Sequence, residues 1–190
     1  YISDELKKNN DIIFHKMEIP PLLNIEDNSI DFVVTFQVIE HIQKDKFFLQ
    51  EIHRVLKPGG KLLLTTPNKL MSLSRNPWHI REYTPAEMKN ILDKYFNQNT
   101  VNGVYGNDLV MDYYEKNKIA VRKITRFDIF NLQHILPRWL LQIPYDILNR
   151  LNRKKLKSQN EKVVQSVTVE DYFIKESTEN CLDYFCVATK

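Results

Sequence analysis

Residues 30–36, IDFVVTF, form a continuous apolar run that is rich in β-branched and aromatic side chains. Such a run is typical of a central strand in a parallel sheet, because both faces of that strand are covered. The period then changes, and apolar residues within 47–56 fall on one helical stripe that PGG at 58–60 should end in a tight turn. A second buried run, KLLLTT at 61–66, follows. Together these segments predict a βαβ unit.

The rest of the chain continues to alternate between strand and helix patterns. The segment SDELKKNN, with Ser3 as a cap, reads as a helix end. TPAE at 84–87 predicts a helix that starts at a capping box, with Thr84 as N-cap and Pro85 in the first turn. The other predicted elements are a strand at 11–17, a loop at 18–29, a helix end near residue 96, a strand at 100–106, helices over 108–160 with breaks at Pro137 and Pro144, and a last strand within 181–190.

This alternation predicts an α/β fold. We expect a Rossmann-like three-layer sandwich with a mostly parallel sheet and an antiparallel last strand. The predicted divisions are a core at 1–107, a helical insertion or lid at 108–165, and a last-strand region at 166–190 that completes the sheet.

Composition excludes several classes of protein. The net charge is only +3, so the chain as a whole has no strong attraction for nucleic acid, and we expect no such partner. Cys181 and Cys186 follow no metal-ligand spacing, and so few cysteines favour a reducing, cytoplasmic setting. No apolar run reaches the roughly 20 residues of a membrane-spanning helix. The oligomeric state stays open.

Polar side chains follow the predicted strands where each strand ends. Gln37, Glu40 and His41 come after residues 30–36, and Asn68 follows the next strand. In open α/β sheets, ligands bind beyond the carboxyl ends of the strands, so these side chains predict a site. The alternative is that Glu40 and His41 only cap the next helix or lie in solvent.

The sequence IEDNSIDFVVTFQVIEHI, followed by FLQEIHRVLKPGGKLLLTTPN, resembles the second half of a class I S-adenosylmethionine-dependent methyltransferase. The resemblance covers roughly residues 1–106, and NPWHIREYTPAEM resembles bacterial members associated with cell-surface glycans. The family's glycine-rich loop has no counterpart, because the chain's glycines are only Gly59, Gly60, Gly103 and Gly106. This absence, and a start at Tyr1 rather than Met, predict a domain that is truncated at its N-terminus.

The resemblance implies S-adenosylmethionine as cofactor and a role for each matching position. His41 is implied as the general base for a hydroxyl acceptor, since imidazole exchanges protons near neutral pH, and Glu40 lies beside it. Arg81 and Glu82 are equally compatible with a structural ion pair. The implied cofactor contacts are Met17, Glu18, Phe36 and Gln37, and the implied substrate contacts are Asn68, His79, Arg81 and Tyr83.

Two metal-using groups, the ubiquinone-pathway O-methyltransferases and the small-RNA 2′-O-methyltransferases, also resemble the chain at QVIEH. By that resemblance Glu40, His41 and His79 would hold a divalent ion such as Mg²⁺. Gln37 stands where those groups carry an acid, and an amide is a weaker ligand for a hard cation. The metal site is therefore not favoured, and His79 is expected to pack on Trp78 or to contact substrate.

Residues 138–157 combine an apolar stripe with a basic end. The pattern suits contact with an anionic membrane, peripheral to its inner face, but a lid packed on the core is favoured. The stripe consists of Leu140, Pro144, Ile147, Leu148 and Leu151, and the cations are Arg150, Arg153, Lys154, Lys155 and Lys157.

The sequence thus predicts a methyltransferase that modifies an oxygen of a small-molecule or glycan-type acceptor. The alternative is a non-catalytic methyltransferase-like domain that binds a partner or a membrane through the insertion.

Overall fold

The computed structural model describes residues 11–128, 132–159 and 165–190. The predicted helix end at SDELKKNN, with Ser3, lies outside the described residues. The elements are β1 (Ile30–Phe36), η1 (Ile39–His41), α2 (Asp45–Val55), β2 (Leu56–Pro67), α3 (Pro85–Leu92), β3 (Gln98–Gly106), α4 (Asp108–Thr125), α5 (Leu132–Ile135), α6 (Arg138–Gln159), η2 (Val169–Asp171), β4 (Tyr172–Glu176) and β5 (Asp183–Thr189).

The strands form one sheet in the order β1-β2-β5-β3-β4. β1 and β2 pair in parallel, which confirms the predicted βαβ unit, and the last strand β5 is antiparallel to both of its neighbours, as predicted. β4, which the sequence did not predict, pairs antiparallel with β3. β1, β2 and β3 therefore share one direction, but only the β1–β2 pair is parallel among the described strands.

The PGG segment does not form the predicted tight turn. α2 ends at Val55 and β2 begins at once, but the register jumps, so that Ile30 faces Leu56 while Phe32 faces Lys61. Residues 57–60 thus bulge out of the β1–β2 ladder. Gly60 fits because a Cβ there would lie 2.9 Å from the carbonyl oxygen of Lys57. The glycines let the strand deform where we expected a tight turn between the helix and the strand.

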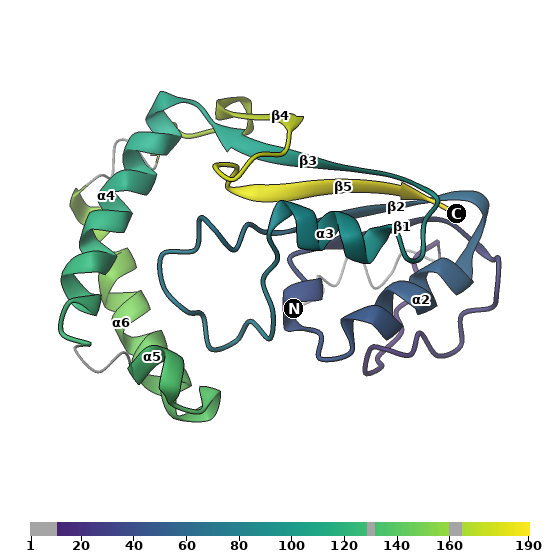
Figure 1. The fold of residues 1–190 in the computed structure, drawn as a ribbon, viewed down its shortest axis with the longest axis horizontal. Helices are drawn as coiled ribbons and strands as arrows, with labels where there is room; N and C mark the ends of the chain where they lie inside the picture. The colour runs from purple at the N-terminus through teal and green to yellow at the C-terminus, as the bar shows by residue number, and fades with distance from the viewer. Residues whose placement is uncertain (1–10, 129–131, 160–164) are drawn as a thin grey trace.

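Helices α2 and α3 cover one face of the sheet (Figure 1). Leu49 and Ile52 from α2, with Met88 and Leu92 from α3, are fully buried in a single apolar core with Tyr184 of β5. On the opposite face Phe32, Val34 and Phe36 are largely exposed. Helices therefore flank the sheet on one side only in the described residues, where three layers were expected. We call the strands with α2 and α3 the sheet layer.

Residues 11–17 contain no strand, contrary to prediction. Most of their side chains are exposed, so the apolar pattern is not matched by the burial that stabilises a strand. The loop that follows is fixed to α2. The Glu51 carboxylate accepts a hydrogen bond from Leu22 N at 2.9 Å, and the Arg54 guanidinium donates to the carbonyl oxygen of Ile25 at 2.9 Å.

The start of α3 confirms the predicted capping box. Thr84 Oγ1 accepts from Glu87 N at 3.3 Å, and the Glu87 carboxylate accepts from Thr84 N at 2.8 Å. Pro85 occupies the first turn, where its missing N–H costs nothing. The helix ends at Leu92, earlier than expected.

α4, α5 and α6 form a helical unit that lies beyond one end of the sheet (Figure 1). α6 begins after Pro137 as predicted, but it runs through Pro144 without the predicted break. The carbonyl of Leu140 loses its usual donor there, and Leu140 is largely exposed, so water can replace that bond. None of the helices that the structure describes is long and apolar enough to cross a membrane.

Candidate active site

A tight turn follows β1 and places polar side chains at the strand end. Gln37 adopts a left-handed backbone conformation with φ of 55°, and its N–H donates to the carbonyl oxygen of Thr65 at 2.9 Å. The short helix η1 then carries Glu40 and His41. The turn explains how an apolar strand leads within a few residues into a polar site.

Glu40 is the buried anchor of this site, with 1% of its surface exposed. Its Oε2 accepts a hydrogen bond from Thr66 Oγ1 at 2.9 Å, and its backbone oxygen accepts from Ile80 N at 2.6 Å. No hydrogen-bond donor reaches its buried Oε1 within the part of the chain that the structure describes. A buried carboxylate oxygen without a partner is costly unless a ligand completes it.

Two histidines face this carboxylate. His41 Nδ1 lies 2.9 Å from the carbonyl oxygen of Trp78, which can only accept, so in the neutral ring Nδ1 carries the proton and Nε2 has the lone pair. His79 Nδ1 lies 2.5 Å from a Glu82 carboxylate oxygen, which fixes the same tautomer in the neutral ring. The two rings meet edge to face with centroids 4.9 Å apart. The Nε2 atom of each histidine therefore takes no part in these two hydrogen bonds.

Glu40, His41 and His79 each offer one ligand atom within 4.8 Å of the others. The prediction that these residues converge is supported by the geometry, although the metal site itself was not favoured. The orphan Glu40 Oε1 and the two outer partners, Trp78 and Glu82, match the way proteins hold a metal ion. The residues present therefore fit a divalent cation, and two imidazoles with one carboxylate suit a transition metal better than Mg²⁺.

Arg81 and Tyr83 both bind Asp45, the first residue of α2. Arg81 Nη1 lies 2.5 Å and Tyr83 Oη 2.8 Å from Asp45 Oδ2. Glu82 instead binds His79 and the Ser72 hydroxyl, so the alternative Arg81–Glu82 ion pair is not formed. Burial, followed by the Asp45 hydrogen bond, raises the pKa of Tyr83 well above its usual value. Tyr83 is buried, which differs from its predicted role as a substrate contact; Arg81 remains half-exposed.

Asn68 is also buried and fully used within the protein. Its Nδ2 donates to the carbonyl oxygen of Cys181 at 2.7 Å, and its Oδ1 accepts from Tyr184 Oη at 2.6 Å and from Leu70 N at 3.0 Å. The predicted substrate contact is replaced by a structural one, because the amide joins β2, β5 and the loop that follows β2.

The predicted cofactor contacts are only partly brought together. Phe36 and Gln37 are exposed at the end of β1, whereas Met17 and Glu18 lie in the irregular segment before it. Asp183, at the start of β5, joins the strand-end group. Burial raises its pKa to about 6, a Gln37 hydrogen bond opposes that shift, and the charge of Glu40 adds to it. Roles for the four predicted residues in cofactor binding stay predictions.

Sequence reasoning missed the residues that support the site, which are Asp45, Thr66, Glu82 and Asp183. Asp45, Thr66 and Asp183 stand far in sequence from the residues that they contact, whereas Glu82 is three residues from His79. Only Glu82 carried a signal, as a charged residue in the long loop after β2.

Part of the chain is similar to known methyltransferases. Residues 2–64 match the family model described as a methyltransferase domain. Over 76 residues the chain is 45% identical to a probable S-adenosylmethionine-dependent methyltransferase from Mycolicibacterium smegmatis. The matched segment is similar to class I S-adenosylmethionine-dependent methyltransferases. The match covers 37% of this chain, which spans only 30% of the length of that relative.

One further relative and one solved structure are similar to this chain. A mitochondrial ubiquinone biosynthesis O-methyltransferase from Rattus norvegicus is 45% identical over 47 residues, which cover 25% of this chain and 14% of the relative. The fold is similar to a solved methyltransferase from Thermotoga maritima, described as a possible histamine N-methyltransferase. That similarity has a TM-score of 0.50 at 15% identity and covers 88% of this chain and 59% of the other, which confirms the Rossmann-like fold.

Proposed function

We propose that the chain takes part in S-adenosylmethionine-dependent methylation of an acceptor hydroxyl on a small molecule or glycan, with His41 as general base. One observation carries the proposal. The Trp78 carbonyl fixes the His41 tautomer and leaves its Nε2 as a proton acceptor just beyond β1. This position suits a catalytic role, because ligands of open α/β sheets bind beyond the carboxyl ends of the strands.

The bound cofactor would supply a methyl group on a positively charged sulfur. Phe36 and Gln37 at the end of β1, with Met17 and Glu18, are the proposed contacts that hold it. His41 Nε2 takes the proton as the acceptor oxygen attacks, and Glu40 Oε1, 3.9 Å away, stabilises the imidazolium that forms. Since methyl transfer is an in-line displacement, alignment of the two substrates should supply much of the rate.

A divalent cation on Glu40, His41 and His79 is the second candidate, favoured by the unpartnered Glu40 Oε1. Such an ion would lower the pKa of a bound hydroxyl. The His41 Nε2 lone pair can serve as base or as metal ligand, but not as both. Titration with Zn²⁺, Mn²⁺ and Mg²⁺ therefore separates the two modes.

The test begins with calorimetric titration of the chain with S-adenosylhomocysteine, with and without each metal. We expect binding that weakens at least tenfold in Gln37→Ala and is unchanged in Lys118→Ala, a matched surface change on α4. Methyl transfer from labelled S-adenosylmethionine is then measured on a panel of hydroxylated acceptors. His41→Gln should keep cofactor binding and lose about 10²-fold or more in rate.

The outcomes separate the alternatives. Tight metal binding that His41→Gln and His79→Gln both abolish would make His41 a ligand instead of the base. Failure of S-adenosylhomocysteine to bind would contradict the enzymatic proposal for this chain, and a longer chain that also failed to bind would favour a non-catalytic methyltransferase-like domain.

A further inference from the structure

A two-part cavity separates the loop 69–83 from the helical unit. One part has a volume of about 410 Å³ and an apolar wall, formed chiefly by Pro77, Ile124, Leu132, Leu136, Leu141 and Leu148. The other, of about 550 Å³, has a more polar wall that includes Ser72, His79, Glu82, Asn117 and Arg153. Val121, Tyr145, Asn149, Asn152 and Ser74 line both parts, so the two parts adjoin.

The polar part borders the candidate active site through His79 and Glu82. The apolar part lies farther along α4 and α6, away from the histidines. An occupant that spans both parts needs a polar end at the histidines and an apolar end between the helices.

The cavity walls are tied together by specific bonds. Tyr114 Oη of α4 donates to the carbonyl oxygen of Met71 at 2.7 Å, and Trp78 Nε1 donates to Asp146 of α6 at 3.1 Å. Arg75 also donates to the carbonyl oxygen of Gln133 at 2.7 Å. These bonds join the loop to the helical unit and fix the distance between them, which suits a preformed pocket.

We propose that this cavity binds the apolar chain of an amphiphilic acceptor whose hydroxylated head lies at His41 and His79. The amides of Asn117 and Asn149 donate and accept hydrogen bonds, as sugar or polyol hydroxyls require. The inference rests on the proposed function for the identity of the reacting hydroxyl. The cavity itself can be tested without any methyl transfer.

The test uses n-alkyl glucosides of six, seven and eight carbons, each below its critical micelle concentration, titrated by calorimetry without cofactor. We expect affinity to rise by up to about fourfold with each methylene, since that is the gain from burying one CH₂. Glucose alone should bind far more weakly. Leu148→Gln should abolish the dependence on chain length, because Leu148 lines the apolar part.

Ile119→Gln is the matched control, because Ile119 lies on α4, which also lines the cavity, but is 53% exposed and absent from the cavity wall. Circular dichroism of both variants checks that the helices remain folded, and Leu136→Gln replaces Leu148→Gln if the latter unfolds. Equal affinity for all chain lengths, or equal loss in the control, would overturn the proposal. Glucoside binding in a chain that fails to bind S-adenosylhomocysteine would refute the proposed function but leave the cavity assignment standing.

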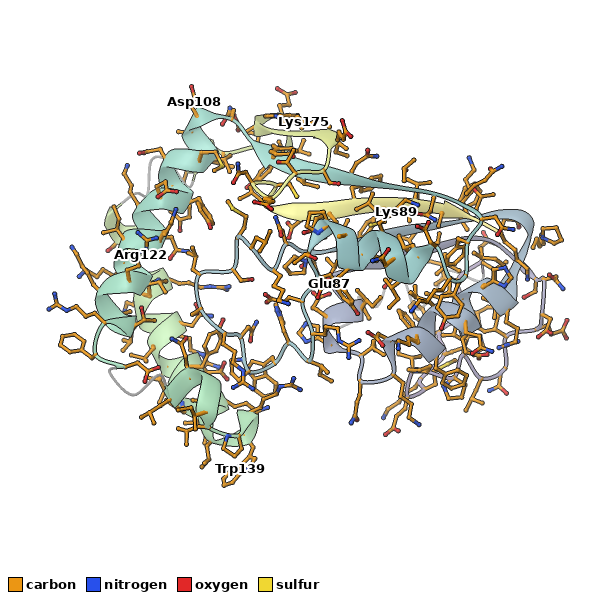
Figure 2. The ribbon with its side chains drawn as sticks, in the orientation of Figure 1. Glu87, Lys89, Asp108, Arg122, Trp139 and Lys175 are labelled. Carbon is orange, nitrogen blue, oxygen red and sulfur yellow. The ribbon has the colours of Figure 1, made fainter. Side chains whose placement is uncertain are left out.

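A separate observation concerns the outer face of α6. Trp139, Ile143, Ile147 and Leu151 recur every four residues and are each at least 54% exposed. Figure 2 shows Trp139 projecting from the start of α6, at the far end of the helical unit. Exposed cations at Arg150, Lys154 and Lys155 follow along the same helix. An apolar row beside cations complements an anionic lipid surface.

We infer that the outer face of α6 lies on an anionic membrane. Co-sedimentation should show binding to vesicles with 30% phosphatidylglycerol, chosen here as the probe, weaker binding to phosphatidylcholine alone, and loss at high salt. Trp139→Ala with Ile143→Ala should weaken binding by at least tenfold, and Ile119→Ala, an exposed change on α4, should not. Failure to bind either vesicle would refute the inference. So would a dimer in sedimentation equilibrium that the double variant abolishes, because a second copy would then cover the face.

Discussion

Helices α2 and α6 both carry apolar stripes, but they use them differently. α2 buries Phe48, Leu49, Ile52 and Val55 against the sheet. α6 is twice as long, with 22 residues against 11, yet none of its described side chains is buried. Its apolar residues face a cavity on one side and solvent on the other. An apolar stripe in sequence therefore predicts a helix, but not whether the stripe stabilises the fold or binds a ligand.

The strongest test of this contrast compares one leucine from each helix. Leu49 is fully buried in the core, whereas Leu148 is 45% exposed. We expect Leu49→Ala to lower the free energy of unfolding by about 2–5 kcal/mol, and Leu148→Ala by less than about 1 kcal/mol. Urea denaturation followed by circular dichroism measures both. Equal losses would show that α6 belongs to the same core as α2.

The second prediction concerns pH and the ion pair that fixes the loop before β1. A hydrogen bond from Arg54 is the main cause that lowers the pKa of Glu51, and the Leu22 N–H adds to it. Because the folded pKa is the lower one, the pair contributes stability above the unfolded pKa of about 4.3 and loses it as pH falls through the folded value.

Glu51→Gln should therefore cost about 1–3 kcal/mol at pH 7 and progressively less as pH falls toward 3. Thermal unfolding of the wild type and the variant at several pH values measures this. Glu115→Gln, which removes the exposed pair with Lys118 on α4, should show little change at any pH. A similar cost for the two variants at pH 7 would contradict the contrast between the sheet layer and the helical unit.

A smaller effect is expected at the start of α3. Thr84→Ala removes the acceptor for Glu87 N and should cost about 1 kcal/mol, while Thr84→Ser should retain most of the stability. Chemical denaturation of the three proteins compares them. An alanine variant as stable as wild type would mean that packing of Met88 and Ile91 alone determines where α3 begins.

The smallest effect should come from the surface of the helical unit. Lys116 and Asp112 form an exposed i,i+4 pair on α4, 2.6 Å apart. Asp112→Asn should change stability by no more than about 0.5 kcal/mol. A double-mutant cycle with Lys116→Gln isolates the pair, and a coupling above 1 kcal/mol would show that α4 depends on its surface charges.

Much of the sheet layer could be predicted from the sequence because its signals are local. Residues close together in sequence are enough to predict three elements. These are β1 from the apolar run 30–36, α2 from its apolar stripe, and the start of α3 from the capping box at Thr84. β4 was missed because its five residues are all exposed and are stabilised only by pairing with β3. The bulge at 57–60 was missed because glycines show that the backbone can adopt unusual dihedral angles, but not whether it forms a turn or a bulge.

The site was predicted less completely, for a related reason. The strand-end rule located Glu40 and His41, and the loop motif located His79. Burial is a long-range property, so the sequence could not show that Asn68 and Tyr83 face inward. Nor could it show that Asp45 accepts the hydrogen bond of Tyr83 Oη, since that contact spans 38 residues.

The two ends of the loop 69–82 are joined to each other independently of its contents. Asn68 and Tyr83 form a β-bridge, Lys69 N donates to the carbonyl oxygen of Tyr83 at 3.0 Å, and Tyr184 Oη contacts both ends. The loop is therefore closed at its base by bonds that do not involve the side chains between its ends. A designed graft between these ends would keep the closure at the base, provided that it restores the bonds of the loop to Glu40, His41 and Asp45. New acceptor preferences could then arise by exchanging one loop on an unaltered scaffold.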